Sequence, residues 1–242
     1  MKSYIPIHII LLVIALPANA QYAISFGAGV DKNQLHTDIS GIPYTREQSE
    51  YGIILNISVS WQAKNWLFLK TGMSYLQKNY TYERTGPYRG MYITFINSYV
   101  QLPLMAGIEY GNRKIKGFLQ TGIYGAYWIR GKMKGKIPDI YNITDTIDNT
   151  GQLVETFKLA SFNEKYNFDS RKDRRFELGW TSGLDISYYL TQKSNLVLEV
   201  NYFRSLTDQQ KNYMINQKAR YNQTFTCTVG YIYHIKQQKS VK

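Results

Sequence analysis

The chain has 242 residues, a formal net charge of +12 and a single cysteine, Cys227. Its length fits one sizeable domain, and one cysteine excludes a disulfide bond within the chain. The basic balance admits nucleic acid or anionic lipid as a partner, or simply a solvated surface rich in lysine.

The first twenty residues have the pattern of an export signal. Lys2 gives a positive start, residues 9–16 form a short apolar core, and Ala18-Asn19-Ala20 matches a small-residue cleavage site. The apolar core is too short for a membrane helix, although a retained N-terminal anchor is the alternative. We therefore expect a signal peptide over residues 1–20 and a mature domain over residues 21–242.

Beyond residue 20 the sequence alternates between apolar and small or polar side chains in eight separate runs. In the second run Ile53, Leu55 and Ile57 lie on one parity, with Ile54, Asn56 and Ser58 between them. A period of two places successive side chains on opposite faces of a strand, so one face is almost wholly apolar. The runs span residues 22–30, 51–61, 67–75, 100–110, 115–129, 176–188, 196–202 and 225–234.

The connections between the runs alternate in length. Short turns are expected at residues 62–65, 111–114 and 191–194, and long polar loops at 31–50, 81–91, 131–173 and 205–222. Short periplasmic turns and long outer loops are typical of outer-membrane barrels. The pattern predicts an all-β fold, an eight-stranded antiparallel transmembrane β-barrel. A soluble sandwich would turn its apolar parity inward and would not need this asymmetry.

Aromatic residues of the apolar parity gather at both ends of the runs, as expected for two interfacial girdles. The expected periplasmic girdle holds Tyr22, Trp61, Tyr110, Tyr188 and Tyr233, and the outer one holds Tyr51, Tyr75, Tyr127, Phe176, Tyr202 and Phe225. Pro103 conflicts with a regular strand because it lacks an amide donor, so we expect a bulge or a missing ladder bond there.

The stretch Tyr99-Val100-Gln101-Leu102-Pro103-Leu104-Met105-Ala106-Gly107 resembles the Pro-containing strand of the PorT-like outer-membrane β-barrel family of Bacteroidetes. The signal peptide, the eight runs and the terminal aromatic strand also look like that family. The resemblance implies an eight-stranded barrel; most members have no assigned activity, and a few resemble components of a secretion and gliding apparatus. Gln101 stands where many members carry Glu, which disfavours a charge-dependent role at this position.

Charged residues of the inward parity form a candidate lumen cluster. An eight-stranded barrel is narrow, and buried charges need partners, so these residues are expected to form a charge-compensated plug; a polar path or small-cation site is the alternative. We expect Glu109 to face Lys116, and Asp185 to lie near Glu199. The cluster comprises Lys70, Glu109, Lys116, Glu177, Asp185, Glu199 and Asn201.

The loop at residues 131–173 combines basic ends with an apolar, tyrosine-containing centre. The centre is expected to form a hairpin above the membrane or a surface that grips a partner. The basic ends are expected to contact lipid headgroups, which makes outer-membrane lipid and lipopolysaccharide the expected partners and nucleic acid an unexpected one. These residues are Arg130, Lys132, Lys134, Lys136, Arg171, Lys172, Arg174 and Arg175.

Motifs of catalysis are sparse. His36 and Asp38 fall in the first outer loop, but no serine has a diagnostic setting, and HExxH, paired CxxC, P-loop and dinucleotide motifs are missing. We expect no cofactor, no metal and no enzyme activity. The prediction is a non-enzymatic outer-membrane barrel whose outer loops bind a partner or envelope component; a small-solute pore and a lipid-modifying enzyme are the alternatives.

Overall fold

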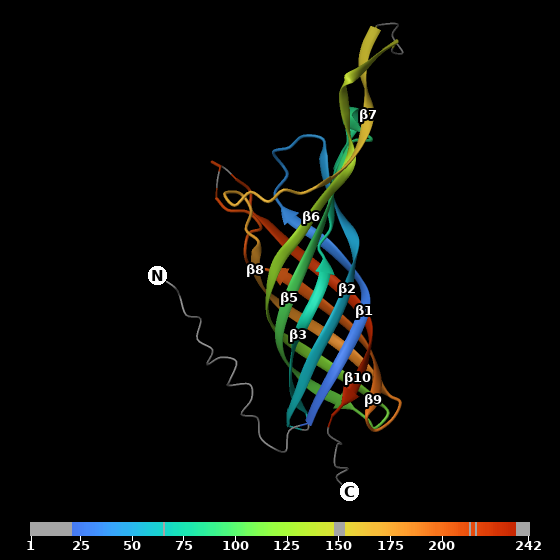
Figure 1. Cartoon of the computed structure of the whole chain (residues 1–242), viewed down its shortest axis with the longest axis vertical. Coiled ribbons are helices and arrows are strands. Elements are labelled where there is room, and N and C mark those ends of the chain that lie inside the picture. The colour runs from blue at the N-terminus through green and yellow to red at the C-terminus, as the bar shows by residue number, and fades with distance from the viewer. Residues whose placement is uncertain (1–20, 65, 148–152, 213, 216, 236–242) are drawn as a thin grey trace.

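The computed structural model describes residues 21–64, 66–147, 153–212, 214–215 and 217–235, so the expected signal peptide lies outside the described residues. Ten strands run along one long axis (Figure 1). No helix among the described residues is long and apolar enough to cross a membrane. The elements are β1 (Gln21–Thr37), β2 (Thr45–Lys64), β3 (Leu67–Gln77), β4 (Tyr80–Arg84), η1 (Gly86–Tyr88), β5 (Tyr92–Gly111), β6 (Ile115–Ile147), β7 (Leu153–Lys165), β8 (Phe176–Tyr189), β9 (Ser194–Ser205) and β10 (Arg220–His234).

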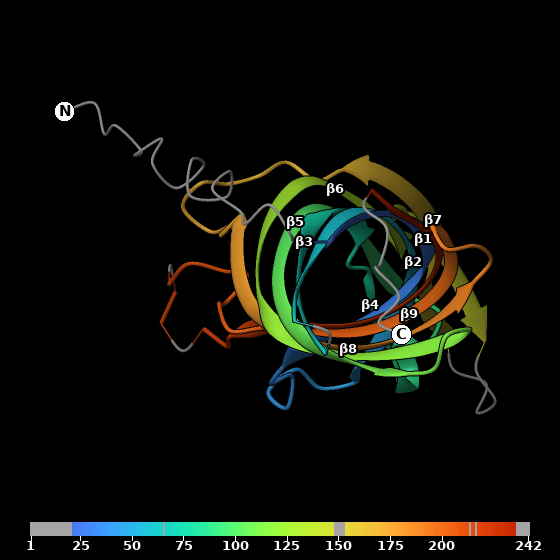
Figure 2. The same ribbon diagram turned by 90° about the horizontal axis from the view of Figure 1, so that it is seen from below.

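Eight of these strands close into an antiparallel ring, in the order β1, β2, β3, β5, β6, β8, β9, β10 and back to β1 (Figure 2). The short strand β4 continues β3 beyond Lys78 and Asn79, and like β3 it pairs with β2 and β5. Strand β7 pairs with the distal part of β6, outside the ring. The predicted eight-stranded barrel is therefore confirmed. Closure leaves no unpaired sheet edge within the ring, as hydrocarbon requires.

The alternation of the sequence becomes an alternation between lumen and outer surface. In β8, Glu177, Thr181 and Asp185 are buried inside, whereas Leu184 and Ile186 are exposed outside. Cys227 is likewise exposed on the outer face of β10. An apolar belt therefore surrounds a polar interior, the reverse of a soluble sheet.

Aromatic side chains border this belt at both ends. Tyr51, Tyr127 and Phe176 are exposed at the outer end, and Tyr110 and Tyr188 at the end of the short turns. Tyr127 and Phe176 are directly paired across β6 and β8. Their positions match the two expected girdles and mark the limits of the membrane-spanning part.

The strands run much further outward than the alternating runs indicated. Residues 31–37 and 45–50 belong to β1 and β2, and 131–147 and 153–165 form the β6–β7 hairpin that projects from one end of the barrel (Figure 1). Most of the loop expected at 31–50 is therefore strand, and the segment 131–173 contains the hairpin that was one of the two alternatives expected there. Backbone pairing can continue beyond the bilayer even where the outer face no longer needs apolar side chains.

Pro103 interrupts the ladder between β3 and β5 without changing its register. Pairs are formed at Thr71–Leu104 and Ser74–Gln101, but between them residues 72–73 of β3 and 102–103 of β5 are not paired with each other. Thr71 Oγ1 donates a 2.9 Å hydrogen bond to the Pro103 carbonyl oxygen. Of the two expected outcomes, the missing ladder bond is the one found.

A bulge in β6 changes which side chains face outward. Tyr99 pairs with Trp128 and Ser98 pairs with Arg130, so Ile129 is an extra residue in β6. Below this bulge the odd-numbered residues, including Tyr127, face outward; above it Gly131 and Gly135 are buried, and Lys134 is exposed. Bulges bend a strand and redirect its side chains.

Candidate functional site

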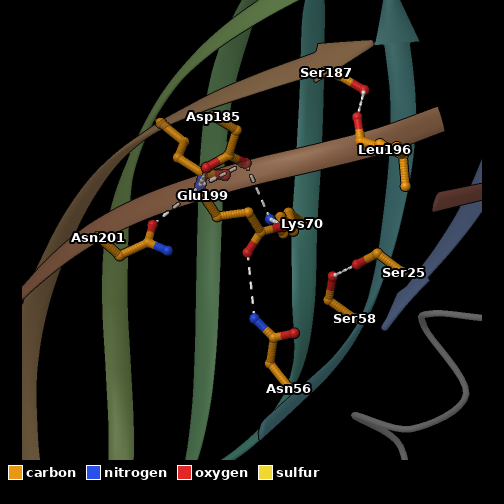
Figure 3. Close-up of polar contacts among 10 residues, drawn as sticks. Ser25, Asn56, Ser58, Lys70, Asp185, Ser187, Leu196, Glu199 and Asn201 are labelled. Carbon is orange, nitrogen blue, oxygen red and sulfur yellow. Dashed lines mark hydrogen bonds and ion pairs between the residues drawn. The ribbon is translucent and has the colours of Figure 1, made fainter. Parts of the chain in front are cut away.

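Lys70 lies in the middle of the lumen between carboxylates of two other strands (Figure 3). Its Nζ is 3.1 Å from Asp185 Oδ2 on β8 and 2.6 Å from Glu199 Oε1 on β9. Because β3 adjoins neither β8 nor β9 in the ring, these ion pairs join opposite walls of the barrel. Amide donors complete the layer: Asn56 to Glu199 (3.3 Å), and Gln120 to Asp185 (3.0 Å) and Asn201 (3.2 Å).

A second charged layer lies in the lumen nearer the outer end. Lys78 has a fully buried side chain and forms an ion pair with Glu177. Its Nζ is also 4.9 Å from the ring centroids of Tyr99 and Tyr124. Glu177 accepts further hydrogen bonds from Tyr124 Oη and Asn222 Nδ2, each 2.7 Å long. The ammonium group is thus held by one carboxylate and two ring faces.

The third layer lies near the short turns. Glu109 and Lys116 form an ion pair, and Gln62 Nε2 donates a 3.1 Å hydrogen bond to Glu109. Lys116 Nζ lies 5.1 Å from the ring centroid of Tyr189, which stacks with His234. All seven candidates of the lumen cluster thus face the interior and share three layers.

The hairpin that carries Glu109 and Lys116 has a different register from the one expected. Gly111, not Glu109, is directly paired with Lys116, and Glu109 is paired with Phe118. Gly111 has φ of 127°, a conformation that glycine adopts readily, and Asn112 N donates to the Ile115 carbonyl oxygen. The ion pair therefore forms diagonally across the two strands.

Among the described residues, small cavities lie in the lumen on either side of Lys70. The one toward the short turns has a volume of about 60 Å³, and the other about 20 Å³. Each has room for a few water molecules at most. Lys70 and Ser58 line both, so the central layer separates them.

Lys78 and Asp31 are two of the buried charged residues that sequence reasoning missed. Lys78 and Asp31 were placed beyond the runs or in an outer loop, yet both are almost fully buried. Asp31 Oδ2 accepts a 3.0 Å hydrogen bond from the backbone N–H of Gln77. The signal was present, because both residues continue the inward parity of their strands.

Beyond the outer girdle, the extended part of the barrel contains Glu47 of β2 and the stacked rings of Tyr80 and Phe95 (centroids 4.9 Å apart). Glu47 precedes the girdle residue Tyr51 in β2 and so lies outside the membrane-spanning part. Among the described residues its buried Oε1 has no hydrogen-bond partner. Burial raises the pKa of Glu47 to about 7, against the opposing effect of Arg220.

We expect Glu47→Gln to stabilise the barrel above pH 7 by roughly 1–2 kcal/mol, after allowance for partial solvent exposure. The folded state keeps a proton on Glu47 that the unfolded chain releases near pH 4.5, so wild-type stability falls as pH rises from about 4.5 to about 7. The measurement is the midpoint of the heat-modifiable gel shift at pH 5 and pH 8. Exposed Glu164→Gln is the control; equal midpoints of wild type and Glu47→Gln at pH 8 would contradict the prediction.

The basic candidates divide into two groups. Arg130, Lys132, Lys134 and Lys136 occupy alternate positions of β6 above the bulge, on its outer face. Arg171, Lys172, Arg174 and Arg175 lie in the segment between β7 and β8. Arg175 packs against the rings of Phe168 and Tyr127, with Cζ 4.3 and 4.6 Å from their centroids. Arg171 is paired with Asp169 at 3.3 Å on the exposed surface.

The β6–β7 hairpin carries an irregular protrusion. Pro138 pairs with Leu159 and Ile143 with Phe157, so residues 139–142 of β6 stand opposite a single residue of β7. Asp139 Oδ1 accepts a 3.0 Å hydrogen bond from the Tyr141 amide, which fixes a local turn. The side chains of Ile140 and Tyr141 are 64% and 92% exposed. We call these four residues the hairpin protrusion.

The residues considered for catalysis are not brought together. His36 is exposed on β1, where it pairs with Tyr221 in β10. Asp38 instead accepts hydrogen bonds from Lys218 Nζ (2.7 Å) and the Ser40 amide (3.0 Å). Within the described ranges, no cluster of three His, Cys, Asp or Glu side chains could hold a metal ion.

Comparison with solved structures finds several outer-membrane proteins at low identity. Neisserial surface protein A has 10% identity and a TM-score of 0.43, covering 89% of this chain and 98% of that one. OprG from Pseudomonas aeruginosa has 9% identity and a TM-score of 0.46 (88% and 95% covered). Ail of Yersinia pestis has 11% identity and a TM-score of 0.41 (87% and 98% covered).

No curated protein matches the chain by sequence. A family model described as an outer membrane protein beta-barrel domain matches residues 18–210, most of the chain. The closed ring, the apolar belt and the two aromatic girdles agree with this match and with a location in the outer membrane. The chain therefore belongs to the outer membrane protein beta-barrel domain family.

Proposed function

We propose that this protein is a closed, non-enzymatic outer-membrane barrel that presents the β6–β7 hairpin to a partner at the cell surface. The observation that carries the proposal is the hairpin protrusion. There Ile140 and Tyr141 are highly exposed on the hairpin that projects from the barrel. Exposed apolar side chains on an ordered loop are typical of interaction sites, and tyrosine is enriched where partners bind. The partner is a protein or another envelope component.

The lumen supports a structural rather than a conducting interior. The cavities on either side of Lys70 are separated by the Lys70 layer, and the Lys78 layer lies across the outer part. Ion pairs across a narrow barrel satisfy the buried charges and hold opposite strands together. We therefore place function on the outer surface and prefer it to the small-solute pore and to the lipid-modifying enzyme.

The finer assignment to the PorT-like family rests on the stretch from Tyr99 to Gly107 and is part of this proposal. In the barrel this stretch belongs to β5, with Tyr99, Gln101 and Met105 buried in the lumen. Alternate residues of this stretch therefore pack in the interior of the barrel. Export by a cleaved signal over residues 1–20 completes the proposal, with an outer-membrane destination in a Bacteroidetes cell envelope.

A shortened hairpin tests the proposal. Ile137 and Ala160 are paired, so a two-residue Asn-Gly turn can replace residues 138–159 and close the remaining hairpin. A photo-crosslinking residue at position 141 of the otherwise wild-type protein identifies the partner on living cells. We expect the shortened protein and Ile140→Ser/Tyr141→Ser to lose co-purification of that partner, while both keep the heat-modifiable gel shift of a closed barrel.

Ile215→Ser is the matched control, because Ile215 is also 92% exposed but lies outside the hairpin. It should keep the partner. If the shortened protein still binds the partner and complements a deletion strain, the hairpin is not the binding site. Steady single-channel conductance of the wild-type protein in a planar bilayer would contradict the closed lumen and favour the pore.

A further inference from the structure

The outer face of the β6–β7 hairpin has a concentration of positive charge near its base. Lys132 of β6 and Lys165 of β7 are directly paired, and Arg130 lies on the same face two residues before Lys132. Directly opposed side chains have Cβ atoms about 5 Å apart, and second neighbours along a strand are about 7 Å apart. Three cationic side chains therefore converge on one small area. We call Arg130, Lys132 and Lys165 the basic triad.

Nothing in the described part of the chain neutralises the basic triad. None of its three residues takes part in an ion pair there, whereas Arg171 and Lys218 are paired with Asp169 and Asp38. Like charges directly opposite each other destabilise a strand pair. The arrangement is therefore unfavourable on its own and becomes favourable when an anion binds between the lysines.

The distance of the basic triad from the outer aromatic girdle places the triad beside the lipid headgroups. Arg130 lies three residues beyond the girdle residue Tyr127, or about 8 Å along the axis of a barrel whose strands are tilted by roughly 40°. The headgroup layer is roughly 5–8 Å thick on each side of the hydrocarbon, and lysine side chains extend toward it from above. Arg175 packs on the Tyr127 ring and adds a guanidinium group at the level of the girdle itself.

We propose that the basic triad, assisted by Arg175, is a binding site for the phosphate groups of lipopolysaccharide in the outer leaflet. Phosphate groups carried by an acylated lipid fit better than a soluble anion, because the exposed apolar residues Ile123, Tyr127 and Ile129 lie below the triad on the same strand and can contact the acyl chains. Lys134 and Lys136 extend the basic face outward, toward the position of the sugar core. This site is separate from the hairpin protrusion and does not depend on it.

The test compares two double variants with the same loss of charge. Lys132→Gln/Lys165→Gln removes two residues of the triad, and Arg113→Gln/Lys114→Gln removes two exposed charges at the opposite end of the barrel. Binding of purified protein in detergent micelles is measured by native mass spectrometry with diphosphorylated lipid A, dephosphorylated lipid A and inorganic phosphate. We expect the triad variant to bind diphosphorylated lipid A about tenfold or more weakly than wild type and the turn variant to bind it normally.

Dephosphorylated lipid A should bind wild type and both variants equally weakly, and inorganic phosphate should not compete at millimolar concentration. Equal binding of diphosphorylated lipid A to wild type and the triad variant would overturn the proposal. So would equal binding of the phosphorylated and dephosphorylated lipids to wild type. Competition by inorganic phosphate that the triad variant no longer shows would assign the site to a free anion and also overturn it.

Discussion

Replacing Lys70 by Met should destabilise the barrel by about 3–5 kcal/mol, because it leaves the carboxylates of Asp185 and Glu199 buried without their counter-ion. All three side chains are less than 10% exposed. The remaining donors, from Asn56 and Gln120, are neutral amides and compensate a buried carboxylate less well than an ammonium group. The measurement is equilibrium unfolding in urea, in detergent or vesicles at pH 7, with the exposed Lys193→Met as control.

A second variant keeps the Lys70 prediction testable if the single variant fails to fold. Combining Lys70→Met with Asp185→Asn and Glu199→Gln removes the uncompensated charges and retains side chains that form hydrogen bonds. We expect this triple variant to recover most of the lost stability, since well-packed neutral replacements of buried ion pairs are often tolerated. A single variant within about 1 kcal/mol of wild type, or a triple variant no more stable than the single one, would show that the ion pairs do not stabilise the barrel.

Gly122→Ala should destabilise the barrel by about 2–3 kcal/mol, whereas Gly125→Ala in the same strand should be neutral or slightly stabilising. A Cβ atom at Gly122 would lie 2.0 Å from the Leu104 carbonyl oxygen of β5, closer than any real contact allows. The obstacle is backbone, so β5 and β6 would have to separate. At Gly125 the nearest atoms would belong to the Phe176 ring, 3.7 Å away.

The same urea unfolding experiment distinguishes the two alanine variants. Gly125→Ala controls for the entropy that any Gly→Ala change removes from the unfolded chain. If both variants unfold at the same urea concentration, the close approach of β5 to β6 at Gly122 is not a constraint on this barrel. A loss confined to Gly122→Ala would show that glycine is needed there so that the two strands can approach closely.

The sequence by itself determined the eight membrane strands, the direction of their faces and the two girdles. A strand that crosses a bilayer must show hydrocarbon-compatible side chains every second residue, so lipid imposes the pattern locally. Tyr127 and Phe176 could be assigned to one girdle in this way before their pairing was known. The same alternation predicted that Lys70, Asp185 and Glu199 face the lumen, because each lies between two residues of the apolar parity.

Tertiary structure decided which of these residues meet. Lys70 reaches Asp185 and Glu199 across the lumen, a contact between non-adjacent strands that depends on the closure of the ring and the stagger of its register. The register also made the contact of Glu109 with Lys116 diagonal rather than direct. A local alternation pattern predicts which face of a strand a side chain occupies, but not which residue of a remote strand it contacts.

The basic face of β6 shows the same limit most clearly. Strict alternation from Tyr127 would direct Arg130, Lys132 and Lys134 into the lumen, but the extra residue Ile129 reverses the parity and turns them outward. A bulge is decided by how two strands pair, so the side chains that follow it cannot be assigned from one strand alone. The sequence therefore determined the barrel and its orientation, whereas strand pairing decided the charged contacts across its lumen and the chemistry of its outer surface.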